Sequence, residues 1–508
     1  MRRHPGSSWA GACLAGSLAL AQFAQTAERL DIGLSGRGTR IEGIRLEAGS
    51  ASAPTVLVIG GLSGADASMA AARAALKQLQ SRPRSARAFN LLVIALANPD
   101  AAPLQFPPRG IAYREHAEAH ALWRWIGLHA PDLVLITSAA DAGLAAALSQ
   151  QAVAEVGRIP ARAGIAPATI AQLGAADIAP SEAHGEMQRR QSRSALELAR
   201  ELAVYYGHDF KAPIYVNAIA LIAQLRLGNV DEVKRLAEPY LDGTRDSLAQ
   251  PNALTMAGHT LFAALARRTG DPRARARVIA AAGLGFEPDG SLKEAMPFNG
   301  QFSDSLYMGT AILADAGALT GERRYFDMAA RHIAFMQKLV LRPDGLYRHQ
   351  PDIDAAWGRG NAFAALGLAW TLGEFPHDHP QYGWLLQQYQ HLMAVLLRFQ
   401  NADGMWPNVI DHPGSYGEYS ATAMIAWAMQ RGIEQGWLRP RNYRPAVARA
   451  WQGILARTGP EGHLVDVCES TARMSSPQDY LDRAAILGTD ARGGAMALLL
   501  ATELAGLK

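Results

Sequence analysis

Residues 302–319 read Phe-Ser-Asp-Ser-Leu-Tyr-Met-Gly-Thr-Ala-Ile-Leu-Ala-Asp-Ala-Gly-Ala-Leu, a polar turn followed by an apolar run of helical character. From Ser194 onward nearly the whole chain repeats this arrangement, with short Gly, Pro and Asp turns between the helices. The predicted helices pair in order as 195–205 with 215–227, 254–269 with 306–319, 325–339 with 361–372, 384–399 with 420–435, and 445–457 with 493–507. Hairpins of roughly 40 to 60 residues predict a closed ring, an (α/α)6 toroid, with an open α-solenoid as the alternative.

The chain before this helical region has a different texture. Residues 32–163 alternate apolar, β-rich runs with alanine-rich helical stretches, which is the pattern of an α/β layer fold. Strands are expected at 55–59, 91–96 and 133–136. We therefore expect an α/β domain over 28–163, a linker over the Pro-, Ala- and Gly-rich segment 164–193, and the all-α domain over 194–508.

Composition excludes several classes of protein. A chain of 508 residues with 49% apolar and 19% charged residues is globular and long enough for at least two domains. The net charge of +3 leaves no electrostatic footprint for nucleic acid. The arginine-rich stretches 189–193 and 273–277 are expected to be solvated surface.

The first residues have the composition of an export signal. Met-Arg-Arg-His is followed by an apolar, small-residue run from Trp9, and Ala19-Leu20-Ala21 forms an A-x-A cleavage site. Residues 1–21 are therefore expected to be a signal peptide, which predicts a periplasmic or secreted protein; a buried N-terminal helix is the alternative. Cleavage would leave Cys468 alone, so neither an internal disulfide nor a cysteine metal site is expected. No other stretch suggests insertion in a membrane.

Four loop segments beside the predicted helices share an unusual composition. Each combines aromatic rings with carboxylate, arginine, histidine or asparagine side chains, the mixture that binds the faces and hydroxyls of sugars. The segments are 302–309, 345–349 together with 357–361, 403–406, and 415–420. Long loops of this kind line a site more often than they only join helices, which favours the toroid over a solenoid.

These segments, in this order, resemble glycoside hydrolase families 88 and 105. The Gly-Ile-Glu-Gln-Gly-Trp run ending at Trp437, Tyr480-Leu-Asp-Arg483 and Gly488-Thr-Asp-Ala-Arg-Gly-Gly494 extend the resemblance over roughly 195–508. It implies an unsaturated uronyl hydrolase that acts on oligosaccharides left by polysaccharide lyases. In such enzymes an aspartate protonates C4 of the terminal unsaturated uronate, water adds at C5, and the resulting hemiketal expels the remaining sugar. One carboxylate thus serves as acid and then as base, whereas most glycosidases need two.

The resemblance places that aspartate at Asp304. Taken from the residues alone, Asp304 is better explained as the N-cap of the helix that follows, and only the resemblance favours catalysis. His349 matches a family position near the uronate, with a turn histidine as the alternative. Arg359, set between Trp357 and Asn361, is suited to bidentate contact with a carboxylate. The remaining expected substrate contacts are Phe302, Met308, Phe363 and Trp406; Trp357 and Trp406 could instead be core aromatics, and Glu418 and Tyr416 are weaker candidates.

The sequence also departs from the family pattern. Phe302 stands where the family has Trp, and Ala362-Phe363 follows Asn361 where it has Gly-Trp. Upstream, where the family has a second important aspartate, the segment 250–259 has none, and Asn252 is the nearest polar residue. Aromatic stacking is retained at Phe302 and Phe363, but the expected pocket has a different shape.

The N-terminal region has a fainter resemblance to zinc carboxypeptidases and succinylglutamate desuccinylases. It is carried by the segments 56–66, 92–100 and 132–138. The positions of the zinc ligands hold Ser63, Asp66 and Thr137, which cannot replace two imidazoles, so a domain without its metal is expected. A generic α/β layer is the alternative reading of the same residues.

The expected function is thus a hydrolase for unsaturated oligosaccharides that uses no cofactor and no metal. A glycan-binding or scaffolding protein derived from two enzymes is the alternative. A polysaccharide lyase or sugar epimerase with Tyr307 or Tyr416 as its base is a third possibility. The sequence leaves the oligomeric state and the source polysaccharide open.

Overall fold

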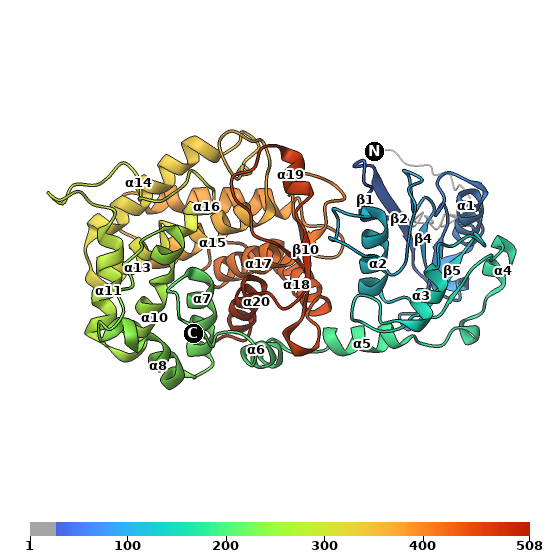
Figure 1. The fold of residues 1–508 in the computed structure, drawn as a ribbon, viewed down its shortest axis with the longest axis horizontal. Coiled ribbons are helices and arrows are strands. Elements are labelled where there is room, and N and C mark those ends of the chain that lie inside the picture. The colour runs from blue at the N-terminus through green and yellow to red at the C-terminus, as the bar shows by residue number, and fades with distance from the viewer. Residues whose placement is uncertain (1–26, 508) are drawn as a thin grey trace, which may run out of the picture.

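A computed structural model describes residues 27–507, which form a sheet-containing part and a helical part (Figure 1). The sheet part is coloured blue to blue-green and the helical part green to red. Residues 1–21, the expected signal peptide, lie outside the described residues. Between residues 27 and 507 no helix has the length and apolar character needed to cross a bilayer.

The first part is built on one mixed sheet with the strand order β1-β2-β4-β3-β5-β6. Strands β3, β4, β5 and β6 are parallel, while β1 and β2 join antiparallel at the β4 edge. The strands are β1 Glu28–Leu34, β2 Arg40–Leu46, β3 Thr55–Ile59, β4 Asn90–Ile94, β5 Leu133–Ile136 and β6 Ala161–Arg162. The predicted central strands are confirmed, with β4 ending two residues earlier than expected.

Helices cover both faces of this sheet, which explains why its central strands are apolar along their whole length. One face packs on α1 (Ala67–Gln80) and α4 (Pro167–Gln172). The other packs on α2 (Ala117–His129), α3 (Leu144–Gln150) and α5 (Glu182–Gln191).

The expected linker over 164–193 instead contains α4 and α5. Ile170 and Met187 project from these helices into the two cores of the sheet part, and Ser181 caps α5. Arg190 and Arg193, expected at the surface, are buried and donate to the main-chain oxygens of Ala456 and Leu455 in the helical part. The prediction failed because the segment is short of apolar residues, and the few that it has, together with Arg190 and Arg193, are buried against the rest of the protein.

The second part consists of helices with short strands in their connections. The helices are α6 Ala195–Ala203, α7 Tyr215–Arg226, α8 Val230–Leu241, α9 Ala253–Gly258, α10 Thr260–Thr269, α11 Pro272–Gly283, α12 Ser305–Met308, α13 Ala311–Thr320, α14 Arg323–Val340, α15 Gly358–Glu374, α16 Tyr382–Leu397, α17 Tyr419–Glu434, α18 Pro440–Ala456, α19 Pro477–Leu481 and α20 Ala491–Leu504. The strands are β7 Trp406–Pro407, β8 Gly417–Glu418, β9 Leu464–Cys468 and β10 Ala485–Gly488.

The inner helices contact one another in a closed succession. The order is α7, α10, α13, α15, α17 and α20, and α20 returns to α7. Helices α7, α15, α17 and α20 are buried on nearly all sides, whereas α6, α8 and α14 bury one face and lie outside them. The predicted helices are found, but most of them pack against other partners than predicted: α6 against α20, α14 against α13, α16 against α15 and α18 against α17. The prediction also omitted α8 and α11, and the helix expected over 254–269 breaks at His259.

Close approach of α12 to α15 fixes the start of the helix that follows Asp304. Gly367 of α15 faces the α12 backbone, and a methyl group added there would lie 2.0 Å from the carbonyl oxygen of Leu306. The absence of a side chain at Gly367 thus lets α12 sit against the ring.

We expect Gly367→Ala to lower the free energy of unfolding by about 1–3 kcal/mol, because the methyl group must push α12 away from α15. Urea denaturation followed by circular dichroism measures the change. Gly383→Ala is the matched control, because its methyl group meets open space in α16; it should leave stability unchanged or raise it by up to about 1 kcal/mol. Equal stability of the two variants would contradict this packing.

Candidate functional site

A cavity of about 670 Å³ opens at the end of the ring where inner helices begin. The first turns of α7, α15 and α20 contribute Tyr215, Arg359 and Arg492 to its wall. The positive ends of these helix dipoles meet at this end of the ring, which suits an anionic ligand. The predicted site residues in its wall are Phe302, Asp304, Met308, His349, Trp357, Arg359 and Phe363.

Asp304 stands at the first turn of α12 but does not cap it. Its backbone is already helical, with φ −53° and ψ −29°, and its carboxylate makes no capping hydrogen bond. Oδ2 instead accepts a hydrogen bond from Nε2 of His349 at 2.9 Å, and 18% of the side chain is exposed to the cavity. The N-cap alternative therefore does not describe this residue, and its carboxylate is available for chemistry.

Two aromatic rings and one phenol hold His349 in place. Phe302 stacks on its imidazole at 4.6 Å between ring centroids, and Trp357 meets it edge-on at 4.7 Å. The hydroxyl of Tyr480 lies 2.8 Å from Nδ1. Burial and the nearby Asp304 charge raise the pKa of Tyr480 above its ordinary value, so the phenol stays protonated and can donate to Nδ1. With Nδ1 accepting, the imidazole of His349 carries its single N–H on Nε2, which faces Asp304.

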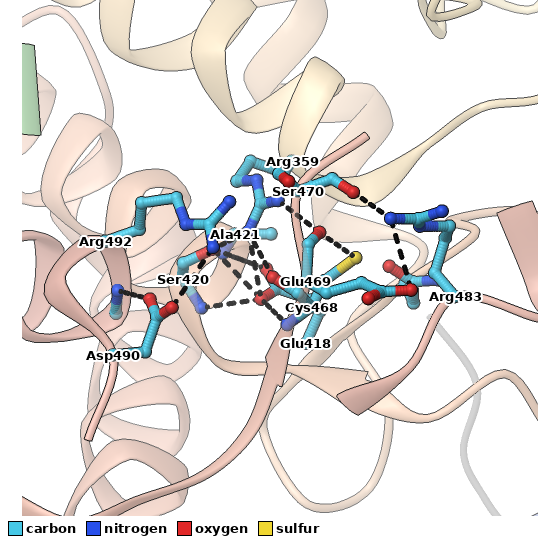
Figure 2. A network of polar contacts seen from close by, with 12 residues as sticks. Arg359, Glu418, Ser420, Ala421, Cys468, Glu469, Ser470, Arg483, Asp490 and Arg492 are labelled. Carbon is cyan, nitrogen blue, oxygen red and sulfur yellow. Dashed lines mark hydrogen bonds and ion pairs between the residues drawn. The ribbon is translucent and has the colours of Figure 1, made fainter. Parts of the chain in front are cut away.

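Arg359 is bound to the protein's own backbone. Its two terminal nitrogens donate to the carbonyl oxygens of Cys468 and Glu469, each at 2.8 Å (Figure 2). Its guanidinium lies 4.8 Å from the Trp357 ring centroid. Arg359 was expected to bind a substrate carboxylate with both terminal nitrogens. These nitrogens instead bind the backbone at the end of β9. Arg359 still lines the cavity, where it contributes charge and holds the wall.

Glu418 is a structural carboxylate at the start of α17. It is fully buried and accepts from the backbone nitrogens of Ser420, Ala421 and Cys468 (Figure 2). Its nearest oxygen lies 4.0 Å from Arg359. Glu418 therefore fixes the same segment of β9 that Arg359 holds.

Several predicted residues lie outside the cavity wall. Asn361 is buried and bonds to the Tyr347 backbone in both directions, holding the turn that carries His349. Trp406 is fully buried and donates its indole N–H to Leu396, so it is a core aromatic. Tyr307 and Tyr416, considered as lyase bases, are also buried outside the wall.

The 403–406 turn serves a contact between the two parts of the chain. Asp403 lies 3.2 Å from Nε2 of His129 and 3.6 Å from Arg457. Burial alone would raise the pKa of Asp403, but His129 and Arg457 hold this pKa below its ordinary value. The aromatic and acidic composition of this turn suggested a sugar site, but the acid is paired and the ring is buried.

The structure adds cavity residues that the sequence prediction did not choose. Arg492, in the first turn of α20, is one-quarter exposed and contacts Asp490 at 3.2 Å (Figure 2). The 488–494 motif had been recognised, but only as the end of the domain. Asn252 caps α9 and lines the same cavity as Asp304, which agrees with its place near the family's missing aspartate. Tyr215 also lines the wall, and only its helix was predicted.

Two of the three positions that the sequence analysis compared with zinc ligands make hydrogen bonds within the sheet part. Asp66 caps α1 by accepting from Ser68 and Met69, and its pKa is lowered by the Ser68 hydroxyl, which donates to it. The Thr137 hydroxyl donates to the carbonyl oxygens of Ile59 and Ser68. Ser63 is exposed.

A carboxylate, an imidazole, cationic side chains and aromatic rings in one concave site are the composition of a sugar-binding catalytic site. Residues 228–508, more than half of the chain, match Glycosyl Hydrolase Family 88, and the chain belongs to this family. The family resemblance drawn from the motifs is thus confirmed for the helical part.

Two characterised relatives have related names. An unsaturated rhamnogalacturonyl hydrolase, YesR of Bacillus subtilis, is 28% identical over 187 residues, which are 35% of this chain and 52% of the relative. An unsaturated 3S-rhamnoglycuronyl hydrolase of Formosa agariphila is 30% identical over 110 residues, 21% of this chain and 29% of the relative. The chain therefore spans about half the length of the first relative and less than a third of the second.

A solved structure shares the fold of the helical part. The crystal structure of a possible GH105 member from Klebsiella pneumoniae aligns with a TM-score of 0.53 at 20% identity, covering 61% of this chain and 93% of that one.

A buried histidine supports the segment that carries Asp304. Nδ1 of His332 accepts from the Met296 backbone at 3.1 Å, and Nε2 lies 3.1 Å from the Ser305 carbonyl oxygen. Nδ1 must be unprotonated to accept, so this ring is neutral in the folded protein. Burial lowers the pKa of His332 to about 4, and that of His259 to about 4 as well.

We expect the free energy of unfolding to fall as the pH drops from about 6.5 to about 4. In that window the unfolded chain protonates both histidines while the folded protein keeps them neutral, so each costs on the order of 3 kcal/mol by pH 4. Chemical denaturation at a series of pH values measures the slope. His332→Gln should be less stable at neutral pH and should show a shallower slope; parallel curves for the two proteins would contradict the assignment.

Proposed function

We propose that this protein removes a terminal 4,5-unsaturated uronic acid from lyase-generated oligosaccharides by hydration of the vinyl ether. The observation that carries the proposal is the uncapped Asp304 carboxylate, paired with His349 in an aromatic cavity. Membership of family 88 and the names of the two relatives support the same chemistry.

Asp304 acts first as an acid and then as a base. In its protonated form it donates a proton to C4, which leaves positive charge on C5 and the ring oxygen. Water adds to C5 and returns a proton to the Asp304 carboxylate. The hemiketal at C5 then opens, and the uronate separates from the rest of the sugar. The chain thus uses one carboxylate twice, as general acid and general base.

His349 fixes the position of the Asp304 carboxylate. The Nε2–H of His349 hydrogen bonds to Oδ2 of Asp304 and holds it at the edge of the cavity. A bound uronate displaces water from the wall formed by Phe302 and Met308 and brings its C4 to this carboxylate.

Arg492 binds the uronate carboxylate. It faces the cavity with only Asp490 as an ion-pair partner among the described residues, whereas Arg359 is occupied by two carbonyl oxygens. The first turns of α7, α15 and α20 add their positive ends around the anion. Phe302, Trp357 and Phe363 give the wall around the sugar an aromatic, apolar lining.

The proposal includes the architecture expected from the sequence. The closed succession of inner helices and the one-sided outer helices support an (α/α)6 toroid. We propose two domains. The first is the domain expected over 28–163, extended by α4 and α5 and derived from a carboxypeptidase-like fold without its metal; the second covers 194–508. Export to the periplasm or the medium, directed by residues 1–21, remains part of the proposal.

Asp304→Asn should lower kcat by on the order of a thousandfold or more, because the amide can neither donate nor accept the catalytic proton. The measurement is loss of the ultraviolet absorbance of the vinyl ether, with a panel of lyase-generated oligosaccharides as substrates. Asn217→Ala, at the rim of the same cavity, is the control and should retain turnover. If the wild type bound fragments without consuming the double bond of any of them, the glycan-binding alternative would replace this proposal.

Arg492→Met should raise KM about tenfold or more, because the substrate carboxylate loses a charge-assisted partner. Steady-state kinetics on the best substrate of the panel measures it. Arg235→Met, which removes an exposed arginine of α8 that pairs with Glu232, should change neither KM nor kcat. An unchanged KM for Arg492→Met would mean that another group binds the substrate carboxylate.

A further inference from the structure

The sheet part holds one strand of the helical part through a buried ion pair. Arg124 of α2 donates to Asp466 of β9 at 2.5 Å, and the two side chains are 7% and 2% exposed. The other terminal nitrogen of Arg124 donates to the Ala485 carbonyl oxygen at 3.0 Å, on the partner strand β10. The Tyr113 hydroxyl lies 3.2 Å from the same carboxylate. Both strands of the β9–β10 hairpin are thus fastened to the sheet part.

Asp466 is an unusual residue of that hairpin. The pairing of β9 with β10 shifts between Val465 and Val467, which leaves Asp466 as a bulge, and its φ of +66° lies in the left-handed region. A non-glycine residue in this conformation is maintained only when its surroundings fix it. Here the fixing contacts come from Arg124 and Tyr113.

The bulge leads directly to the cavity. Two and three residues beyond Asp466, the carbonyl oxygens of Cys468 and Glu469 bind Arg359 (Figure 2). Ser470 and Thr471, which follow, form part of the cavity wall. The position of the bulge therefore determines where this wall stands.

An apolar cluster runs along the same route. Tyr113 stacks on Tyr416 with ring centroids 4.7 Å apart. Tyr416 belongs to a buried cluster with Trp357 and Tyr480, and both of these contact His349. The sheet part thus reaches two groups beside the Asp304–His349 pair through continuous packing.

We propose that Arg124 and Tyr113 are positioning residues of the active site, so that the sheet part sets the cavity wall of the helical part. The inference rests on the proposed function for its kinetic consequence, but its structural consequence is independent of turnover. Removing Arg124 leaves the buried Asp466 charge without its partner, which favours withdrawal of the bulge toward water. The wall at Ser470 and Thr471 and the anchor of Arg359 then loosen.

The test compares Arg124→Met, the double variant Arg124→Met/Asp466→Asn, and Tyr113→Phe in the full chain. The double variant removes the uncompensated charge, and Tyr113→Phe removes only the hydroxyl contact, so at least one variant should fold if Arg124→Met does not. His129→Gln is the matched control, because it removes a contact between the same two parts, to Asp403, that does not lead to β9.

Two measurements are made on each folded variant. Hydrogen exchange followed by mass spectrometry should show faster exchange over 466–474 in the Arg124 variants than in His129→Gln. With the best oligosaccharide substrate, KM should rise about tenfold while kcat and its pH profile change less than about threefold, since the Asp304–His349 pair stays intact. A role limited to stability would lower the active fraction, and hence kcat, at unchanged KM.

The outcomes separate this inference from the proposed function. Equal exchange over 466–474 in the Arg124 variants and His129→Gln would overturn it whether or not any substrate is turned over. Faster exchange with an unchanged KM would also overturn it, because the wall would then move without affecting the sugar. If the wild type consumes no unsaturated oligosaccharide, the exchange result alone decides the inference and the proposed function fails separately.

Discussion

The hydrogen bond between His349 and Asp304 depends on several features of the helical part acting together. Gly367 lets α12 approach the ring, and the Ser303 backbone donates to the His349 carbonyl oxygen at 3.0 Å, joining the two loops. Nε2 of His332 contacts the carbonyl oxygen of Ser305 in the first turn of α12. Because of these contacts, the Asp304 carboxylate points at the His349 imidazole. An aspartate at the start of a helix more often caps the helix with its carboxylate.

The cavity receives its character from the ends of the inner helices. Their first turns bring Tyr215, Arg359 and Arg492 to one opening, together with the positive ends of the helices. Arg359 is bound to β9, and β9 is bound to α2. The position of one wall of this opening therefore depends on both parts of the chain. The sheet part is therefore more than an appended domain in this account.

Periodicity and motif order predicted the central strands, most of the helices and seven of the residues in the cavity wall. The strands and helices followed from local patterns, whereas the positions of Asp304, His349 and Phe302 came from the family resemblance. The prediction that the turn with Asp403 and Trp406 binds sugar was wrong. An aromatic and acidic turn has the same composition whether it faces a sugar, the core or another domain. Arg359 was placed correctly but its partners, two carbonyl oxygens more than 100 residues away in sequence, are invisible to local reasoning. Arg492 was missed because its motif was taken only as a boundary.

The central claim is that Asp304 delivers a proton to C4 of an unsaturated uronate. The most direct measurement is turnover in deuterium oxide, with the products followed by nuclear magnetic resonance as they form. The account predicts deuterium on one face of C4 at the moment the remaining sugar is released, and no such product with Asp304→Asn. Release of that sugar with C4 and C5 still joined by their double bond would contradict it, because cleavage would then occur at the glycosidic bond without hydration.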